Sequence, residues 1–214
     1  MPQISKPALT LWAIRLTVVY MATLALSIAA IGYEWAFAEG VIRPEDDLDP
    51  DSSFFYYSQW AGWLMVLPVY LLNVAWIHSA HVEAISLAPE HNRQTLMKPL
   101  RSVAGMIIPP FSLFIPYLVM RQIWNLTLVP DGPVTGPAPR FFWLWWFSFV
   151  LAGVLAGVIW SNPFGTVITD HTDVFRPLLV YHVFELIAAG CFLHMIQAIS
   201  DRLVTLKVNA ETFS

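Results

Sequence analysis

The chain has 214 residues, of which 57% are hydrophobic and only 12% are charged. An ordinary globular domain carries about 25% charged residues, so the composition excludes a soluble domain. It predicts an all-α integral membrane protein built as a single membrane domain over residues 1–214. The formal charge is −4 at pH 7, and no basic patch extends beyond short loops, so we expect the lipid bilayer and no nucleic acid as a partner.

Residues 8–33 form the first apolar run and are long enough to span a membrane. The run is followed by Ala36-Phe37-Ala38, which resembles a signal-peptidase site. Because the run exceeds the usual signal core of about 7–15 residues, we expect an uncleaved anchor. Residues 39–53 then form an acidic loop that lacks the residue pattern of an EF-hand, so we expect a solvated outer loop.

Three further runs, residues 60–82, 141–161 and 178–200, are also long and apolar enough to be membrane spans. The loop that precedes the second of these is rich in proline and glycine. The one cysteine, Cys191, lies inside the last run and excludes an internal disulfide.

Residues 102–124 are apolar but contain Pro109, Pro110 and Pro116. Each proline lacks an N–H and clashes with the carbonyl four residues earlier, so one straight helix cannot pass through all three. Two interpretations follow: a kinked helix that crosses completely, or a broken segment that enters and returns. Lipid offers no partner to the freed backbone groups, so a broken segment must be covered by other helices or water.

The distribution of the 11 Lys and Arg residues favours the second interpretation. If the segment returns, Arg15 lies near the start of its span, Arg43 and Arg176 lie outside, and eight cations share the side of the N-terminus. Those eight are Lys6, Arg93, Lys98, Arg101, Arg121, Arg140, Arg202 and Lys207. A complete crossing would give five against five. The positive-inside rule therefore predicts four transmembrane helices plus a re-entrant or interfacial segment, with both termini cytoplasmic.

Several aromatic and proline residues carry a family resemblance. They are Trp76 near the end of the second span, the spacing Pro109-x6-Pro116-Tyr117, the pair Ile123-Trp124, and the pair Trp145-Trp146. With these residues and the order of spans over about residues 60–206, the chain resembles the bacterial membrane family called domain of unknown function 4328. The resemblance implies a multi-pass protein of the bacterial inner (cytoplasmic) membrane. The family has no established activity, so the resemblance implies no catalytic residue.

Three histidines are candidate ligands for a haem b or a transition metal. His78 and His81 lie three residues apart near the end of the second span, and His194 is expected at a similar depth on the last. Neutral imidazole is a good ligand for both groups. A histidine at the wet end of a helix needs no such role, so the interpretation that we favour is structural, with no cofactor.

His182 and Glu185 are also three residues apart, in the outer half of the last span. A carboxylate inside a membrane is costly, so it is expected to face the bundle interior and to have a partner. A local bond between the two residues satisfies both. A proton-handling or ion-binding role is the functional alternative.

No motif in the sequence names a reaction. The leading hypothesis is a non-catalytic accessory or interaction subunit of a membrane assembly, because no convergent polar site is visible and the chain is small. Its partners would be other membrane subunits or further copies of the chain. A small transporter or channel-like protein, using the broken segment and Glu185, is the second hypothesis. A haem or metal redox subunit is the third, and a lipid-modifying enzyme is the last.

Overall fold

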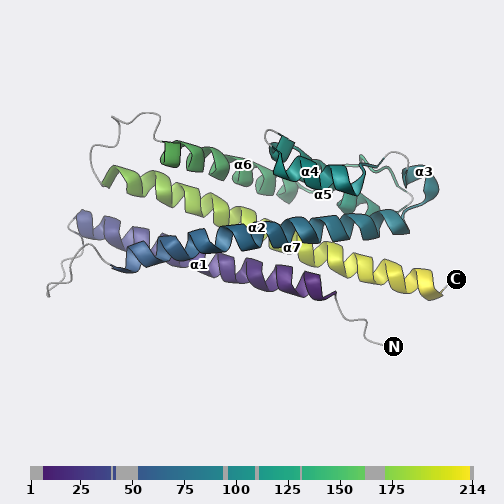
Figure 1. Cartoon of the computed structure of the whole chain (residues 1–214), viewed down its shortest axis with the longest axis horizontal. Helices are drawn as coiled ribbons and strands as arrows, with labels where there is room; N and C mark the ends of the chain where they lie inside the picture. The colour runs from purple at the N-terminus through teal and green to yellow at the C-terminus, as the bar shows by residue number, and fades with distance from the viewer. Residues whose placement is uncertain are drawn as a thin grey trace. The chain divides into compact units, whose positions relative to one another are not determined.

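The computed structural model describes residues 7–39, 41, 53–93, 96–108, 111–130, 132–161 and 172–212. Every secondary structure element within these ranges is a helix, which confirms the all-α prediction. In chain order the elements are α1 (Ala8–Ala38), α2 (Ser53–Leu87), α3 (Glu90–Arg93), α4 (Pro99–Ile107), the 3-10 helix η1 (Phe111–Leu113), α5 (Ile115–Leu128), α6 (Arg140–Ser161) and α7 (Thr172–Thr212) (Figure 1).

Four of the described helices, α1, α2, α6 and α7, are long and apolar enough to cross a membrane. At about 1.5 Å per residue, the 31 residues of α1 extend about 46 Å and the 41 residues of α7 about 62 Å. Both lengths exceed a hydrocarbon core of about 30 Å. The chain is therefore a membrane protein whose spans continue as helix beyond their most apolar stretches.

The limits of α7 and α2 differ from those of the predicted spans. The last span was predicted over residues 178–200, but α7 begins at Thr172 and ends at Thr212. Its extension follows from composition, because the residues after Cys191 include neither glycine nor proline to end the helix. Similarly, α2 begins at Ser53 and includes four aromatic residues that precede the predicted span: Phe54, Phe55, Tyr56 and Tyr57. Most of the predicted acidic loop, 39–53, lies outside the described residues.

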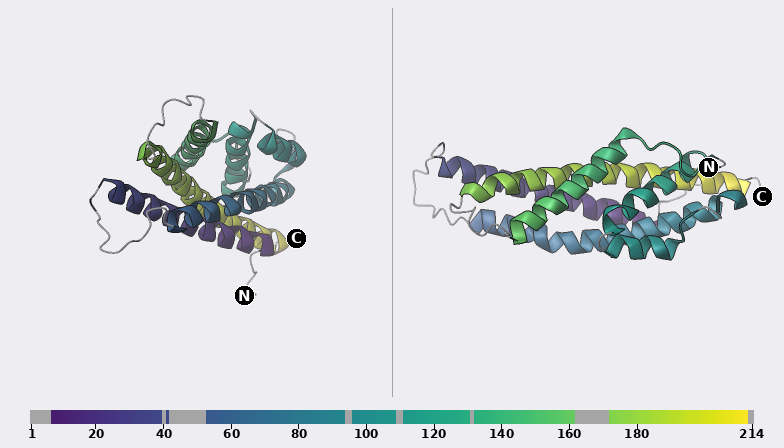
Figure 2. Two further views of the ribbon diagram at one scale, coloured as in Figure 1. Left: turned by 60° about the vertical axis from the view of Figure 1, so that its left-hand side comes forward. Right: turned by 90° about the horizontal axis from the view of Figure 1, so that it is seen from above.

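The predicted broken segment consists of α4, η1 and α5. The direction of α4 differs by 106° from that of the stretch Phe111–Leu128, and Figure 2 shows α4 and α5 as separate short ribbons. Pro109 and Pro110 lie outside the described residues. Pro116 lies in the first turn of α5, where its missing N–H has no intrahelical acceptor to lose. The break precedes Ile115, and the ring of a proline at this position opposes extension of α5 toward α4. That Pro116 helps to break the helix stays a prediction.

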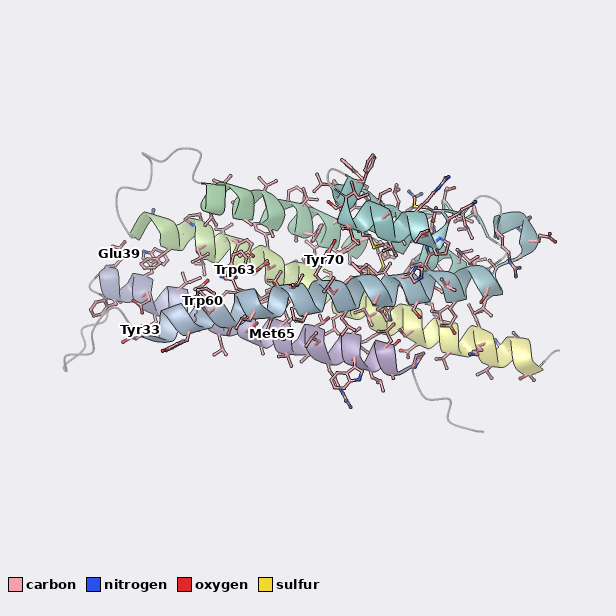
Figure 3. The ribbon with its side chains drawn as sticks, in the orientation of Figure 1. Tyr33, Glu39, Trp60, Trp63, Met65 and Tyr70 are labelled. Atoms are coloured by element: carbon pink, nitrogen blue, oxygen red, sulfur yellow. The ribbon has the colours of Figure 1, made fainter. Side chains whose placement is uncertain are left out.

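Close packing of α4 on α5 depends on Gly105. A Cβ added there would lie 2.7 Å and 2.9 Å from the two γ carbons of Ile115 and 3.1 Å from its Cβ. The end of α4 is also attached to α2, because the Tyr70 hydroxyl donates to the Met106 carbonyl over 2.7 Å (Figure 3 labels Tyr70). This bond satisfies one of the carbonyls that a helix C-terminus leaves without a partner.

The chain forms two compact units. The first unit comprises Met1–Leu16, Val69–Trp143 and Cys191–Ser214 and contains α3, α4 and α5. The second comprises Thr17–Pro68 and Leu144–Gly190. Each of the four long helices contributes residues to both.

Each unit has its own buried interior. In the first unit, large buried side chains include those of Trp76, Ile123, Phe142 and Met195. The buried residues of both units include polar ones, and polar groups inside a membrane are costly without partners. In the second unit they include Thr17, Ser27, Glu34, Ser58, Ser148 and His182, with Tyr20 also buried.

The faces turned away from the interior are apolar, as lipid contact requires. On α2, for example, Trp60 and Trp63 are about half exposed (Figure 3). Apolar exposure of this kind is expected where the surrounding solvent is hydrocarbon rather than water.

Candidate functional site

Glu185 carries a carboxylate within the apolar part of α7, and its side chain is largely buried. Its Oε1 accepts a 2.9 Å hydrogen bond from the Tyr20 hydroxyl on α1, and its Oε2 lies 3.3 Å from His182 Nδ1. Only 15% of the Glu185 side chain and 7% of the His182 side chain are exposed. The predicted local pair is therefore present, with a second partner that comes from another helix.

The other ring nitrogen of His182 reaches α2. His182 Nε2 lies 2.9 Å from Oε1 of Gln59, which is a hydrogen-bonding distance. Nε2 of the Gln59 amide is buried without a hydrogen-bond partner among the described residues. One histidine thus links a glutamine on α2 to a carboxylate on α7.

Helix geometry places three of these groups together on α7. Tyr181 and His182 precede Glu185 by four and three residues, which are the spacings at which side chains meet on a helix surface. The Tyr181 hydroxyl interacts with the same carboxylate, and its ring packs against His182 at 4.8 Å between centroids. We call Tyr20, Gln59, Tyr181, His182 and Glu185 the Glu185 cluster; all five lie in the second unit.

The neighbourhood of the cluster contains a further bond between α1 and α2. Ser27 Oγ on α1 donates over 3.2 Å to the carbonyl of Ser58, which directly precedes Gln59. The nearest cation along α7, Arg176, lies over the Trp35 ring at 5.6 Å from its centroid. In the described part of the chain, the ion pair formed by Glu185 is the one with His182.

The other three candidate histidines lie in the first unit and have different surroundings. His81 is completely buried, with Nδ1 3.1 Å from Ser102 Oγ on α4 and Nε2 without a partner among the described residues. His78 is half-buried, whereas His194 is exposed and packs edge-on against Phe141 at 5.1 Å. The described residues contain no group of three or more His, Cys, Asp or Glu that could hold a metal ion. Ligation of haem or metal by His78, His81 or His194 stays a prediction.

The aromatic residues that carry the family resemblance pack around the start of α6. Tyr117 lies 5.1 Å from Trp143, and Trp124 lies 5.4 Å from Phe141 and 5.3 Å from Phe142 between ring centroids. Farther along α6, Trp145 is buried and stacks with Phe149, and Trp146 is half-buried. These contacts are aromatic packing within each unit.

Trp124 also makes a cation–π contact. The guanidinium of Arg202 on α7 lies over the Trp124 ring at 3.9 Å from its centroid. For a half-buried cation such as Arg202, a cation–π contact is worth about 1 kcal/mol. The interaction fixes the end of α7 to α5 within the first unit.

Three side chains hold the loop between α5 and α6, which sequence analysis treated only as a proline- and glycine-rich connection. Asn92 donates to two of its carbonyls at 2.9 Å and 3.1 Å, and Asn125 to two more, both at 3.0 Å. Arg121 adds two further bonds, one of 2.9 Å. The acceptors are the carbonyls of Pro130, Gly132, Val134, Thr135 and Gly136.

A family model described as Domain of unknown function (DUF4328) matches residues 46–201. The chain belongs to this family. The match confirms the resemblance drawn from the tryptophan and proline residues, and it includes four members of the Glu185 cluster. Tyr20 precedes the matched region, so α1 contributes its donor from outside the DUF4328 match. No curated protein and no solved structure matches the chain.

Sequence analysis identified His182 and Glu185 but missed Tyr20, Gln59 and Tyr181. A signal for them was present, because a tyrosine or glutamine within an apolar span needs a hydrogen-bond partner when it is buried. What the sequence does not state is which partner each one finds.

Proposed function

We propose that this DUF4328 protein is a small transporter or channel-like membrane protein in which Glu185 binds the ion that moves. The observation that carries the proposal is the set of hydrogen bonds that joins side chains of α1, α2 and α7 around one largely buried carboxylate, directly from Tyr20 and through His182 from Gln59. An ionisable residue inside a membrane is costly and marks ion pathways or proton relays by default. A purely structural role would need only the local bond to His182.

The geometry favours this function over the accessory role that the sequence alone suggested. That expectation depended on the absence of a convergent polar site, and the Glu185 cluster is such a site. The accessory role stays a prediction, and purification from native membrane in mild detergent tests it. Stable co-purification of another membrane subunit would support it, and a chain that always migrates alone would count against it.

We further propose that the chain lies in a bacterial inner membrane with both termini cytoplasmic and with α4–α5 as a re-entrant hairpin. The 9 residues of α4 and the 14 of α5 extend about 14 Å and 21 Å, so neither crosses a core of about 30 Å. Large apolar side chains at the turn, including Ile107, Phe111 and Phe114, are exposed, as insertion into lipid requires. The excess of Lys and Arg on the N-terminal side supports the orientation.

Labelling with an impermeant maleimide tests this topology in intact cells. A cysteine at Ser52 should react from outside, whereas cysteines at Thr95 and Thr135 should react only after permeabilisation. The background is one half-buried cysteine, Cys191, which is replaced by serine first. Reaction of the Thr135 position from outside would restore five spans and contradict the hairpin.

Ion flux in proteoliposomes tests the role of Glu185. Gradients of H⁺, Na⁺ and K⁺ are imposed separately, and their dissipation is followed with ion-sensitive dyes. We expect the wild-type chain to dissipate at least one gradient and Glu185→Gln to lose that flux while remaining folded. Glu90→Gln, on the exposed start of α3, is the matched control and should keep it. No flux for the wild type, or equal flux for Glu185→Gln, would refute the proposal.

A further inference from the structure

The amide oxygen of Gln59 determines which nitrogen of His182 carries a proton. Oε1 of an amide accepts hydrogen bonds and donates none. The 2.9 Å contact between Gln59 Oε1 and His182 Nε2 is therefore a bond in which Nε2–H donates. His182 Nε2 is protonated in this arrangement, whatever the state of Nδ1.

The opposite side of the ring then needs one more proton. His182 Nδ1 and Glu185 Oε2 lie 3.3 Å apart, and without a proton between them two lone pairs would face each other in a buried site. The proton resides either on Nδ1, giving imidazolium and carboxylate, or on Oε2, giving neutral imidazole and carboxylic acid. The two forms contain the same atoms and differ only in the position of one hydrogen.

We infer that the ion handled at Glu185 is a proton shared between His182 Nδ1 and Glu185 Oε2, and that Gln59 is the positioning residue that keeps this proton there. The inference rests on the proposed function and names the ion for it. Release transfers the shared proton to water and leaves a carboxylate beside neutral, Nε2-protonated His182. Uptake reverses the step, so the pair alternates between net charges of zero and −1.

The remaining neighbours suit a proton carrier. Tyr20 donates to Oε1 over 2.9 Å, which stabilises the carboxylate once the shared proton has left. The titratable groups that face the carboxylate are Tyr20 from α1 and Tyr181 and His182 from α7. The group contributed by α2, Gln59, does not titrate.

The donor set also disfavours a metal cation at the same carboxylate. Hard cations such as Ca²⁺ and Mg²⁺ require several oxygen ligands that present lone pairs. Here the groups bonded to Glu185 present hydrogens, from the Tyr20 hydroxyl on one oxygen and from the His182 side on the other. A bound cation would have to displace both before it reached the carboxylate.

Nitrogen-15 NMR of the whole protein in lipid tests the assignment without reference to transport. The His182 ring resonances are identified as those that disappear in His182→Gln. We expect wild-type Nε2 to be protonated. In Gln59→Leu, Nε2–H loses its acceptor, so the pair should release one proton to solvent and keep the other on Nδ1, which then donates to ionised Glu185. Gln59→Glu, whose ionised carboxylate only accepts, should keep the wild-type pattern.

One variant serves as a control for this experiment, and two results would contradict the inference. Gln122→Leu, which removes a half-buried glutamine of α5 in the first unit, should leave the His182 resonances unchanged. A wild-type ring protonated at Nδ1 with a bare Nε2 would mean that the Gln59 amide donates, and would overturn the inference even if Gln59→Leu failed to fold. An unchanged spectrum in Gln59→Leu would overturn it as well.

Flux measurements separate this inference from the proposed function. Proton flux that Glu185→Gln abolishes supports both. Flux of Na⁺ or K⁺ alone that is lost in Glu185→Gln would support the transport function but refute the inference that the ion is a proton. The expected NMR pattern without any flux would refute transport and leave the shared proton as a property of the pair.

Discussion

The hydroxyl of Tyr20 on α1 donates to the carboxylate of Glu185 on α7, across 165 positions of sequence and a distance of 2.9 Å. Both residues lie in apolar helices of the second unit, and hydrocarbon around these helices offers neither group a hydrogen-bond partner. The bond therefore joins two helices and holds the carboxylate at the same time. Removal of either partner is expected to affect stability as well as any ion binding.

Replacement of Tyr20 by phenylalanine tests the contribution of this bond. Tyr20→Phe keeps the ring but removes the donor, so we expect the free energy of unfolding to fall by about 1–2 kcal/mol. Thermal unfolding in a mild detergent measures the change. Tyr33→Phe is the matched control on the same helix, because Tyr33 is exposed, and it should have little effect. Equal stability of the two variants would show that the Tyr20 bond contributes nothing measurable.

Glu185 is expected to tolerate an amide better than an apolar residue. Glu185→Gln retains oxygen and nitrogen atoms that can bond Tyr20 and His182, whereas Glu185→Leu removes the acceptor of the Tyr20 hydroxyl and the partner of His182 Nδ1. We expect the leucine variant to be less stable than the glutamine variant by about 1–3 kcal/mol. Unfolding in detergent gives the comparison. Equal losses in both variants would indicate that the negative charge itself, and not hydrogen bonding, stabilises the cluster.

Gly105→Ala should separate α4 from α5. The new Cβ would lie within 3.1 Å of three carbons of Ile115, and one of these is the branched Cβ, which cannot rotate away. Overpacking of this kind costs about 1–3 kcal/mol. Combining it with Ile115→Ala removes the two closest contacts, those to the γ carbons, and should recover part of the loss. If Gly105→Ala is as stable as the wild type, the close approach of the two helices is wrong.

Gly153 provides the control for that substitution. It lies in the interior of α6, and nothing comes within 4 Å of an added Cβ. Because alanine is about 1 kcal/mol better than glycine in a helix interior, Gly153→Ala should be neutral or slightly stabilising. An added Cβ at Gly157, four residues further along α6, also has no neighbour within 4 Å.

Asn125→Ala should loosen the loop between α5 and α6. The Asn125 amide donates to the carbonyls of Val134 and Gly136, both at 3.0 Å. Without it, we expect faster hydrogen exchange and faster proteolysis within residues 129–139, with the long helices unchanged. Asn209→Ala on the exposed end of α7 is the control. Unchanged exchange in the loop would show that Arg121 and Asn92 hold it without Asn125.

From the sequence alone we predict the class of protein, the four long apolar helices and the interrupted segment between the second and third of them. Those features depend on local properties: apolar length relative to a bilayer, and the missing N–H of proline. The ends of the helices could not be predicted from apolar length alone. The membrane limits the apolar stretch, but the helix continues until a residue or a contact ends it, so α7 extends to Thr212 and α2 begins at Ser53.

The tertiary structure decided the partners. His182 and Glu185 are neighbours through helix periodicity, and that pair was predictable. Gln59 is 123 positions from His182, and Tyr20 is 165 from Glu185, so no local pattern connects them. From the sequence, several polar residues in the apolar spans were equally possible hydrogen-bond partners of Glu185. The choice among them follows from which helix faces pack together, because a buried carboxylate bonds only to the donors that this packing brings within about 3 Å.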